Sequence, residues 1–151
     1  MSGSKSSDEP VTVSGCRFWQ FPTFADRRGN LTLADLATMS FPVRRMFYIS
    51  QVPEGQTRAN HAQRESEQLL LAVTGSVSVM IDDGRNKQTI VLRRHNVGLL
   101  IAPKTWCSLS QFSSDAVLAV FASHAYDAAD QIADYDEFLS ISLGDSRGPG
   151  R

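Results

Sequence analysis

The stretch GQTRANHAQRESEQLLLAVTG, residues 55–75, constrains the fold of this chain more than any other. A glycine stands at each end, and His61, Gln63 and Glu67 lie between them at spacings of two and four. Residues i and i+2 of a β-strand share a face. We therefore expect His61 and Gln63 to point together into the mouth of a small β-barrel, with Glu67 facing the same cavity at a deeper level.

The residues around this stretch predict an all-β fold. Residues 68–73 form a nearly continuous apolar run, which is typical of a strand buried on both faces. Apolar and polar residues alternate over 76–81, which indicates a half-buried strand, and the sequence Asp-Asp-Gly at 82–84 predicts a hairpin turn. Many short strands with frequent turns predict a sandwich, a jelly roll or a barrel.

The pattern changes near the C-terminus. Residues 127–140, DAADQIADYDEFLS, place apolar side chains at helical spacing among acidic ones. We expect one C-terminal helix near residues 128–140, packed on the outside of the barrel.

The ends of the chain are polar and rich in Ser or Gly. Such composition predicts a disordered lead at 1–10 and a flexible tail at 144–151, which leaves one domain at 11–143. The apolar residues within 11–21 would form an exposed edge strand, which is a liability unless another strand pairs with it. Exchange of this segment between two protomers would supply the pairing.

The composition excludes several classes of partner. A net charge of −1 with 21% charged residues gives no reason to expect a nucleic-acid or anionic-membrane surface. No apolar run approaches the ~20 residues of a membrane span, and the N-terminus lacks the apolar segment of a signal peptide. Two cysteines far apart form no disulfide framework and fit a reducing compartment. We therefore expect a cytoplasmic location.

His61 is the candidate catalytic residue. Of the three histidines, His95 lies in a polar turn, His124 follows the last strand, and only His61 is expected at the barrel mouth. An imidazole near its ordinary pKa can take and return a proton at neutral pH. Arg28 and Arg58 are the candidate phosphate-binding residues, because a guanidinium offers a bidentate fork.

Two more positions are candidates for the wall of the binding pocket. Trp106 is expected as core or pocket wall rather than as a stacking platform, with a wall that stacks on a base as the alternative. Cys107 follows it directly, so the two side chains should point to opposite faces of a strand. A free cysteine with few basic neighbours is most often a small buried hydrophobe.

Several segments together resemble one known family. These are DRRGNL (26–31), RRMFYI (44–49), RANHAQRESEQLLLAVTGSVSVMIDDG (58–84), VGLLIAPKTW (97–106) and the run from FSSDAVLAVFAS to YDAADQIADYDEF. In order and spacing, over residues 16–140, they resemble the sugar 3,4-ketoisomerases, cupins that act on dTDP-4-keto-6-deoxy-D-glucose. The resemblance implies a jelly-roll barrel of two antiparallel sheets. It also implies a homodimer with exchanged N-terminal strands and a dTDP-linked keto sugar in each barrel.

The resemblance implies a reaction as well. A base removes the acidic C3 proton beside the C4 ketone, an enediolate forms, and the proton returns at C4 to leave a 3-keto sugar. In the family, a His-x-His pair at the barrel mouth carries this chemistry, helped by a Tyr on the preceding strand. A His or Arg after the Pro-x-x-Trp segment shapes the configuration at C4.

The sequence departs from the family at three of these places. His61 matches the first His, but Gln63 replaces the second, Phe47 replaces the Tyr, and Cys107 replaces the His or Arg. Loss of such a proton-relaying group commonly costs ~10²–10⁴ in rate. Tyr48 is a substitute donor in type, but it should point to the other face of its strand from Phe47.

A cupin metal site would need a second His where Gln63 stands and another where Cys107 stands, so we expect no metal and no cofactor. Arg28, Arg58 and Gln68 match family positions and would support binding of a nucleotide-sugar. Three hypotheses follow. The first is a 3,4-ketoisomerase with His61 as base, the second a nucleotide-sugar-binding cupin with little or no catalysis, and the third a related sugar epimerase that uses His61 alone.

Overall fold

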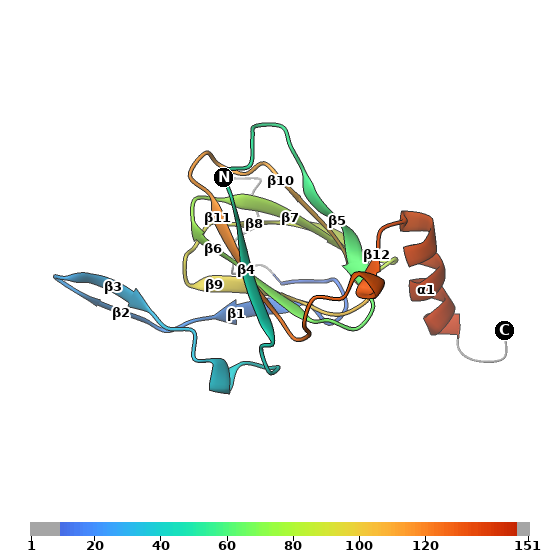
Figure 1. The fold of residues 1–151 in the computed structure, drawn as a ribbon, viewed down its shortest axis with the longest axis horizontal. Helices are drawn as coiled ribbons and strands as arrows, with labels where there is room; N and C mark the ends of the chain where they lie inside the picture. The colour runs from blue at the N-terminus through green and yellow to red at the C-terminus, as the bar shows by residue number, and fades with distance from the viewer. Residues whose placement is uncertain (1–9, 148–151) are drawn as a thin grey trace.

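Two five-stranded antiparallel sheets enclose the core of the protein in the computed structural model, which describes residues 10–147 (Figure 1). The first sheet has the order β1 (Arg17–Gln20), β9 (Val97–Ile101), β6 (Gln68–Thr74), β11 (Val117–Ala122) and β4 (Arg45–Ser50). The second has the order β12 (Gln131–Ile132), β5 (Arg58–Gln63), β10 (Trp106–Ser110), β7 (Val77–Asp82) and β8 (Lys87–Leu92). The predicted all-β jelly roll with a C-terminal helix is confirmed.

The core lies between the inward faces of the two sheets. Val77, Val79 and Ile81 of β7 are fully buried, and Leu99 and Leu118 of the first sheet belong to the same cluster. Every second residue of β7 therefore faces this core, as the alternation predicts. The outer face of β7 is also largely covered, because Met80 packs in a second cluster with the C-terminal helix. The expectation of a half-buried strand is thus wrong for β7.

Gly75 shows why a glycine closes the central motif. It lies between β6 and β7 with φ of 74°, a left-handed conformation that favours glycine. A Cβ atom there would lie 2.7 Å from the Cα of Ala116. The tight turn between the two sheets therefore requires a residue without a side chain.

The C-terminal helix α1 spans Tyr135–Arg147, so both predicted ends are wrong. Residues Ala128–Asp130 form a 3-10 turn, and Gln131–Ile132 pair with β5 as strand β12. The helix begins only after Asp134, whose side chain accepts a hydrogen bond from the Asp136 N–H at 3.0 Å. Within the tail expected at 144–151, the helix continues through residue 147, and 148–151 lie outside the described residues.

The N-terminal segment is paired within its own chain. Residues 1–9 of the expected lead lie outside the described residues, but β1 pairs along its length with β9. The segment does supply an edge strand of the first sheet, as expected, but its apolar side chains are not exposed: Phe21 is 2% exposed in the core, and Phe18 and Trp19 are half-buried. Apolar side chains are exposed instead on the hairpin of β2 (Thr23–Asp26) and β3 (Gly29–Thr32), which projects away from the barrel (Figure 1).

Two 3-10 turns and α1 are the helices of residues 10–147, and none has the length and apolar character that crossing a membrane requires. The first of these turns, Leu36–Thr38, follows the hairpin and leads into β4.

Candidate functional site

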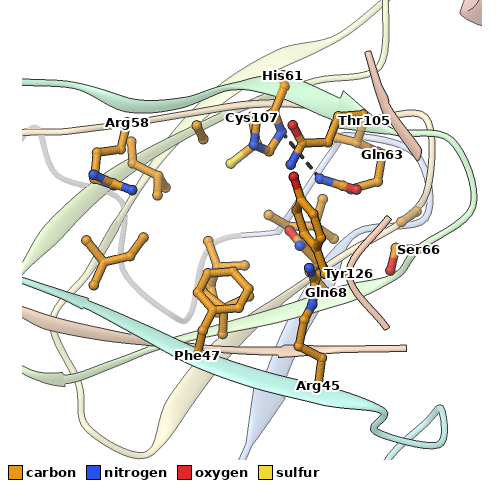
Figure 2. Close-up of a pocket in the computed structure, with 18 residues that line it drawn as sticks. Arg45, Phe47, Arg58, His61, Gln63, Ser66, Gln68, Thr105, Cys107 and Tyr126 are labelled. Atoms are coloured by element: carbon orange, nitrogen blue, oxygen red, sulfur yellow. Dashed lines mark hydrogen bonds between the residues drawn. The ribbon is translucent and has the colours of Figure 1, made fainter. Parts of the chain in front are cut away.

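A cavity of about 400 Å³ opens into the barrel between the two sheets (Figure 2). Both sheets contribute to its wall, and the strands present alternate side chains to it. The side chains that line it include Arg45, Phe47, Arg58, His61, Gln63, Ser66, Gln68, Thr105, Cys107, Leu109, Tyr126 and Gln131. The structure thus brings together six of the predicted site residues, namely His61, Phe47, Arg58, Gln63, Gln68 and Cys107, whose roles stay predictions.

A bulge in β5 decides which of its residues face the cavity. His61 pairs with Cys107 of β10 and Arg58 pairs with Leu109, so β5 uses one residue more than β10 between the two pairs. Ala59 and Asn60 absorb this extra residue with φ of 70° and 56°. In a regular strand Arg58 would face away from His61. The bulge therefore brings the guanidinium and the imidazole to the same cavity.

The bulge is held by hydrogen bonds. The Ser108 hydroxyl donates to the side-chain carbonyl of Asn60, and the Asn60 amide donates to the Thr57 hydroxyl at 3.3 Å. Left-handed conformations of residues other than glycine are strained and cluster at functional sites, where the surrounding structure enforces them. The strain at Ala59 and Asn60 lies directly before the candidate base.

His61 is half-buried, and burial lowers its pKa below the ordinary 6.5. The imidazole is therefore mainly neutral at neutral pH, as a base requires. The side-chain amide of Gln63 lies 3.4 Å from His61 Nδ1. The atom in this contact is the amide nitrogen of Gln63, which donates to Nδ1 and thereby favours the tautomer of His61 whose proton lies on Nε2.

The other two departures from the family also line the cavity, one beside His61 and one on the opposite sheet. Cys107 is buried directly beside His61 on β10, and burial, with Cys16 nearby, raises the pKa of the Cys107 thiol to about 12. This thiol is protonated at neutral pH and carries no charge. Phe47 lines the cavity from β4, whereas Tyr48 is 66% exposed on the outer face of that strand, as expected from alternation.

Several residues of the cavity wall are not among the predicted site residues, and three of them, Arg45, Ser66 and Tyr126, are notable. The guanidinium carbon of Arg45 lies 5.4 Å from the centre of the Phe47 ring and 5.6 Å from that of Tyr126. Arg45 Nε and the hydroxyl of Ser66, a residue 1% exposed, are buried without a hydrogen-bond partner in the described part of the chain. A buried polar group without a partner is costly, so these two atoms point to ligand groups that would satisfy them.

The alternation of side chains along a strand predicts two of these three residues, Arg45 and Ser66. Arg45 stands two residues before Phe47, and Ser66 stands two before Gln68, so each shares a face with a predicted site residue. Tyr126 lies in a loop after β11, where no periodic signal applies.

Two predicted binding residues do not line this cavity. Glu67 precedes β6 and faces away from Gln68; its backbone N–H donates to the Ser123 hydroxyl at 2.8 Å. Trp106 points to the outer face of β10, opposite Cys107, and its ring lies 5.2 Å from that of Tyr135. The period of two turns both side chains away from the cavity. The expectation that Glu67 faces the cavity is therefore wrong, and Trp106 is core rather than pocket wall.

Arg28 also lies apart from the cavity of its own chain. It occupies the turn of the β2–β3 hairpin, its side chain is 87% exposed, and it forms an ion pair with Asp26 at 2.7 Å. The hairpin projects away from the barrel, so Arg28 could reach a cavity only in another copy of the chain (Figure 1).

Across residues 10–147, the structure forms no cluster of three or more His, Cys, Asp or Glu side chains suited to a metal ion. The polar groups of the cavity are instead one imidazole, two guanidinium groups, three amides and several hydroxyl groups. This set can bind the phosphates and hydroxyl groups of a ligand and move a proton through one base.

Comparison with known proteins gives consistent matches. The family model described as "FdtA: WxcM-like, C-terminal" matches residues 14–142. The TDP-4-oxo-6-deoxy-alpha-D-glucose-3,4-oxoisomerase of Aneurinibacillus thermoaerophilus is 37% identical over 119 residues, which cover 78% of this chain and 86% of that protein.

Solved structures agree with this match. A 3,4-ketoisomerase from Helicobacter canadensis is 35% identical, with a TM-score of 0.82 over 85% of this chain and 98% of that one. The sugar 3,4-ketoisomerase QdtA from Thermoanaerobacterium thermosaccharolyticum, solved in complex with TDP, is 29% identical, with a TM-score of 0.86 over 89% of this chain and 98% of that one.

Proposed function

The chain belongs to the FdtA family of WxcM-like C-terminal domains, and from this premise we propose that it is a sugar 3,4-ketoisomerase. Its substrate is a dTDP-linked 4-keto-6-deoxyhexose, which it converts to the 3-keto isomer through an enediolate. The observation that carries the proposal is a barrel cavity with a single imidazole, His61, set between guanidinium groups in a chain of this family. The relatives are an oxoisomerase and a ketoisomerase, which favours catalysis over the binding-only alternative.

In this proposal His61 is the base. It takes the C3 proton and returns it to C4, and because C3 and C4 are adjacent, one base on one face of the sugar serves both steps. Arg45 and Arg58 place positive charge in the cavity, where it stabilises the negative charge of the enediolate or holds a phosphate. Gln63 orients the imidazole through the contact at Nδ1.

The buried polar atoms fit a sugar ligand. The Ser66 hydroxyl and Arg45 Nε are both buried without partners among the described residues, and both residues contribute to the cavity wall. Hydroxyl or phosphate oxygens would satisfy them. Gln68 and Gln131 add two amides; Gln131 pairs with Gln63 across β12 and β5 and so shares its face.

The test is incubation of the chain with dTDP-4-keto-6-deoxyglucose in D₂O, followed by NMR. We expect deuterium at C3 or C4 and a 3-keto product. Deuterium exchange without a 3-keto product would favour an epimerase instead. Tight binding of dTDP with neither exchange nor product would favour the binding-only alternative, and no binding at all would contradict the assignment of ligand class.

The exposed hairpin supports a homodimer with exchanged N-terminal strands. Phe24 and Leu31 of the hairpin are 59% and 60% exposed. Met46 and Tyr48 of β4, the edge strand of the first sheet, are 51% and 66% exposed. An unpaired apolar edge of this kind favours pairing with a second copy. Laying the hairpin against β4 of a partner would cover both apolar surfaces and carry Arg28 toward the partner's barrel.

Sedimentation tests this assembly. We expect a particle of twice the chain mass of 16.6 kDa, and we expect Leu31→Asp to convert it to a monomer, because a charge would be buried in the interface. Asp35→Ala lies beyond the hairpin in the first 3-10 turn and serves as a control that should stay dimeric. A wild-type monomer at micromolar concentration would contradict the proposal.

A cytoplasmic location completes the proposal. Cys16 and Cys107 are both free, and Cys107 lies in the cavity wall. Free thiols are the usual state of cysteine in a reducing compartment.

A further inference from the structure

The proposed isomerisation, on which this inference rests, moves two protons. One leaves C3 and arrives at C4, and His61 carries it. The other must leave the C3 hydroxyl, which becomes a ketone, and arrive on the C4 oxygen, which becomes a hydroxyl. This second transfer runs between two oxygen atoms and needs a group that can accept a proton and donate one.

Few side chains of the cavity can do this. Arginine guanidinium groups do not release a proton in proteins, and glutamine amides do not titrate. Phe47 has no polar atom, and the Cys107 thiol, with its pKa raised to about 12, is buried beside His61 on β10. Thr105 has its hydroxyl 3.9 Å from the Cys16 sulfur, on the side of β1. The Ser66 hydroxyl is deeply buried, since that residue is only 1% exposed. A hydroxyl at the open end of the cavity is the remaining type.

Tyrosine supplies such a hydroxyl at one position. The chain has three tyrosines. Tyr48 faces outward from β4, and Tyr135 lies in the outer cluster, where its hydroxyl donates to Asp82 at 2.5 Å. Tyr126 alone of the three lines the cavity.

The setting of Tyr126 suits a relay. Its ring lies against the Arg45 guanidinium at 5.6 Å, and the same guanidinium contacts the Phe47 ring, so Arg45 joins the loop after β11 to the wall of β4. Figure 2 shows the ring standing above Arg45 with its hydroxyl directed toward Gln63 and His61. Within residues 10–147 no hydrogen bond engages this hydroxyl, and the side chain is 67% exposed at the rim. A bound sugar would meet it directly.

We propose that Tyr126 is a catalytic residue that relays the hydroxyl proton, with Arg45 as its positioning residue. The phenol oxygen accepts the proton of the C3 hydroxyl while its own O–H bond breaks and its proton passes to the C4 oxygen. The C3 oxygen loses its O–H bond, the C4 oxygen gains one, and the phenol oxygen forms one and breaks one, so the phenol ends with a proton as it began. Tyr126 thereby replaces, from a loop, the phenol that Phe47 lacks.

The test compares Tyr126→Phe with Tyr48→Phe, the same chemical change on the outer face. For Tyr126→Phe we expect formation of the 3-keto product to fall by about 10²-fold, because a relay is lost. We expect deuterium exchange at C3 to fall by only about tenfold, because His61 is intact. The affinity for dTDP should stay within about twofold of the wild-type value. Tyr48→Phe should behave as wild type. Phe47→Tyr added to Tyr126→Phe should recover product formation, because it restores a phenol to the cavity.

The outcomes separate the two proposals. Wild-type isomerase activity with an unaffected Tyr126→Phe variant would overturn the relay and leave the proposed function standing. An equal loss of exchange, product and dTDP affinity would also overturn it, since that pattern reports a structural role. Absence of isomerisation by the wild-type chain would contradict both proposals.

Discussion

Activity should follow the protonation of His61. Burial lowers the pKa of this imidazole below 6.5, and only the neutral form can accept a proton. At a pKa of 6.5 about three quarters of the imidazole would be neutral at pH 7, so the buried residue is neutral in a larger share. We expect the acid limb of kcat/KM, which reports the free enzyme, to have its midpoint below pH 6.5.

Replacing the base should remove this limb together with most of the rate. Asn at position 61 has a similar size and keeps an amide opposite Gln63, but it does not titrate. We expect His61→Asn to lower kcat/KM by ~10²–10⁴, which corresponds to ~2.7–5.5 kcal/mol of activation free energy. Affinity for dTDP should change by no more than a few-fold. The assay is product formation and C3 deuteration by NMR across a pH series.

His95→Asn is the matched control, because His95 is exposed in the turn between β8 and β9, outside the cavity. It should keep the wild-type rate and pH profile. An acid limb centred above pH 6.5, or a His61→Asn variant with wild-type exchange, would refute the assignment of His61 as the buried base.

The same pKa shift affects stability. The unfolded chain, with an ordinary imidazole pKa, takes up a proton before the folded chain does as the pH falls. Protonation therefore favours the unfolded state, and the contribution of His61 to the free energy of unfolding decreases as the pH falls below about 6.5.

Four further experiments test the site and its support. Gln63→His should raise isomerase activity, because it restores the imidazole pair of the family, and adding Phe47→Tyr should raise the activity further. Activity is measured by NMR and dTDP binding by calorimetry. A double variant that binds dTDP but is inactive would favour the binding-only alternative. Cys107 should react with iodoacetamide far more slowly than a free cysteine, because burial raises its pKa to about 12, and rapid labelling of the native protein by mass spectrometry would contradict this. Phe138→Ala should lower the free energy of unfolding by ~3–5 kcal/mol, because it leaves a cavity where α1 makes its fully buried contact with the barrel. The kcat at low temperature should stay near the wild-type value. A loss below ~1 kcal/mol in denaturant titration would show that α1 contributes little to stability. EDTA treatment should leave the calorimetric titration with dTDP unchanged, and binding that needs added metal would restore the metal-cupin hypothesis.

Local pattern in the sequence was sufficient where a strand is regular. The spacing of His61 and Gln63 places both side chains in the cavity, and the adjacency of Trp106 and Cys107 places them on opposite faces, as the structure has them. The prediction that Glu67 faces the cavity assumed that the strand containing Gln63 continues to residue 67. In the structure β5 ends at Gln63, and a new strand begins at residue 68. Alternation holds only within a strand.

Contacts between distant segments decided the rest. Arg58 reaches the cavity because β10 forces an extra residue of β5 into a bulge. Helix α1 begins seven residues later than predicted, because Gln131–Ile132 pairs with β5 as a strand. The same pairing places Gln131 in the cavity wall. Tyr126 enters the site from a loop and contacts Arg45, which lies on another strand.

The sequence by itself therefore determined the family, the barrel and the face on which the base lies, because each of these depends on residues close together in the chain. Which arginine, amide and phenol share the cavity with His61 was decided by strand register, a bulge and loop closure. In these features, contacts between segments remote in sequence stabilise a locally strained backbone. The periodic pattern of a sequence does not reveal such contacts.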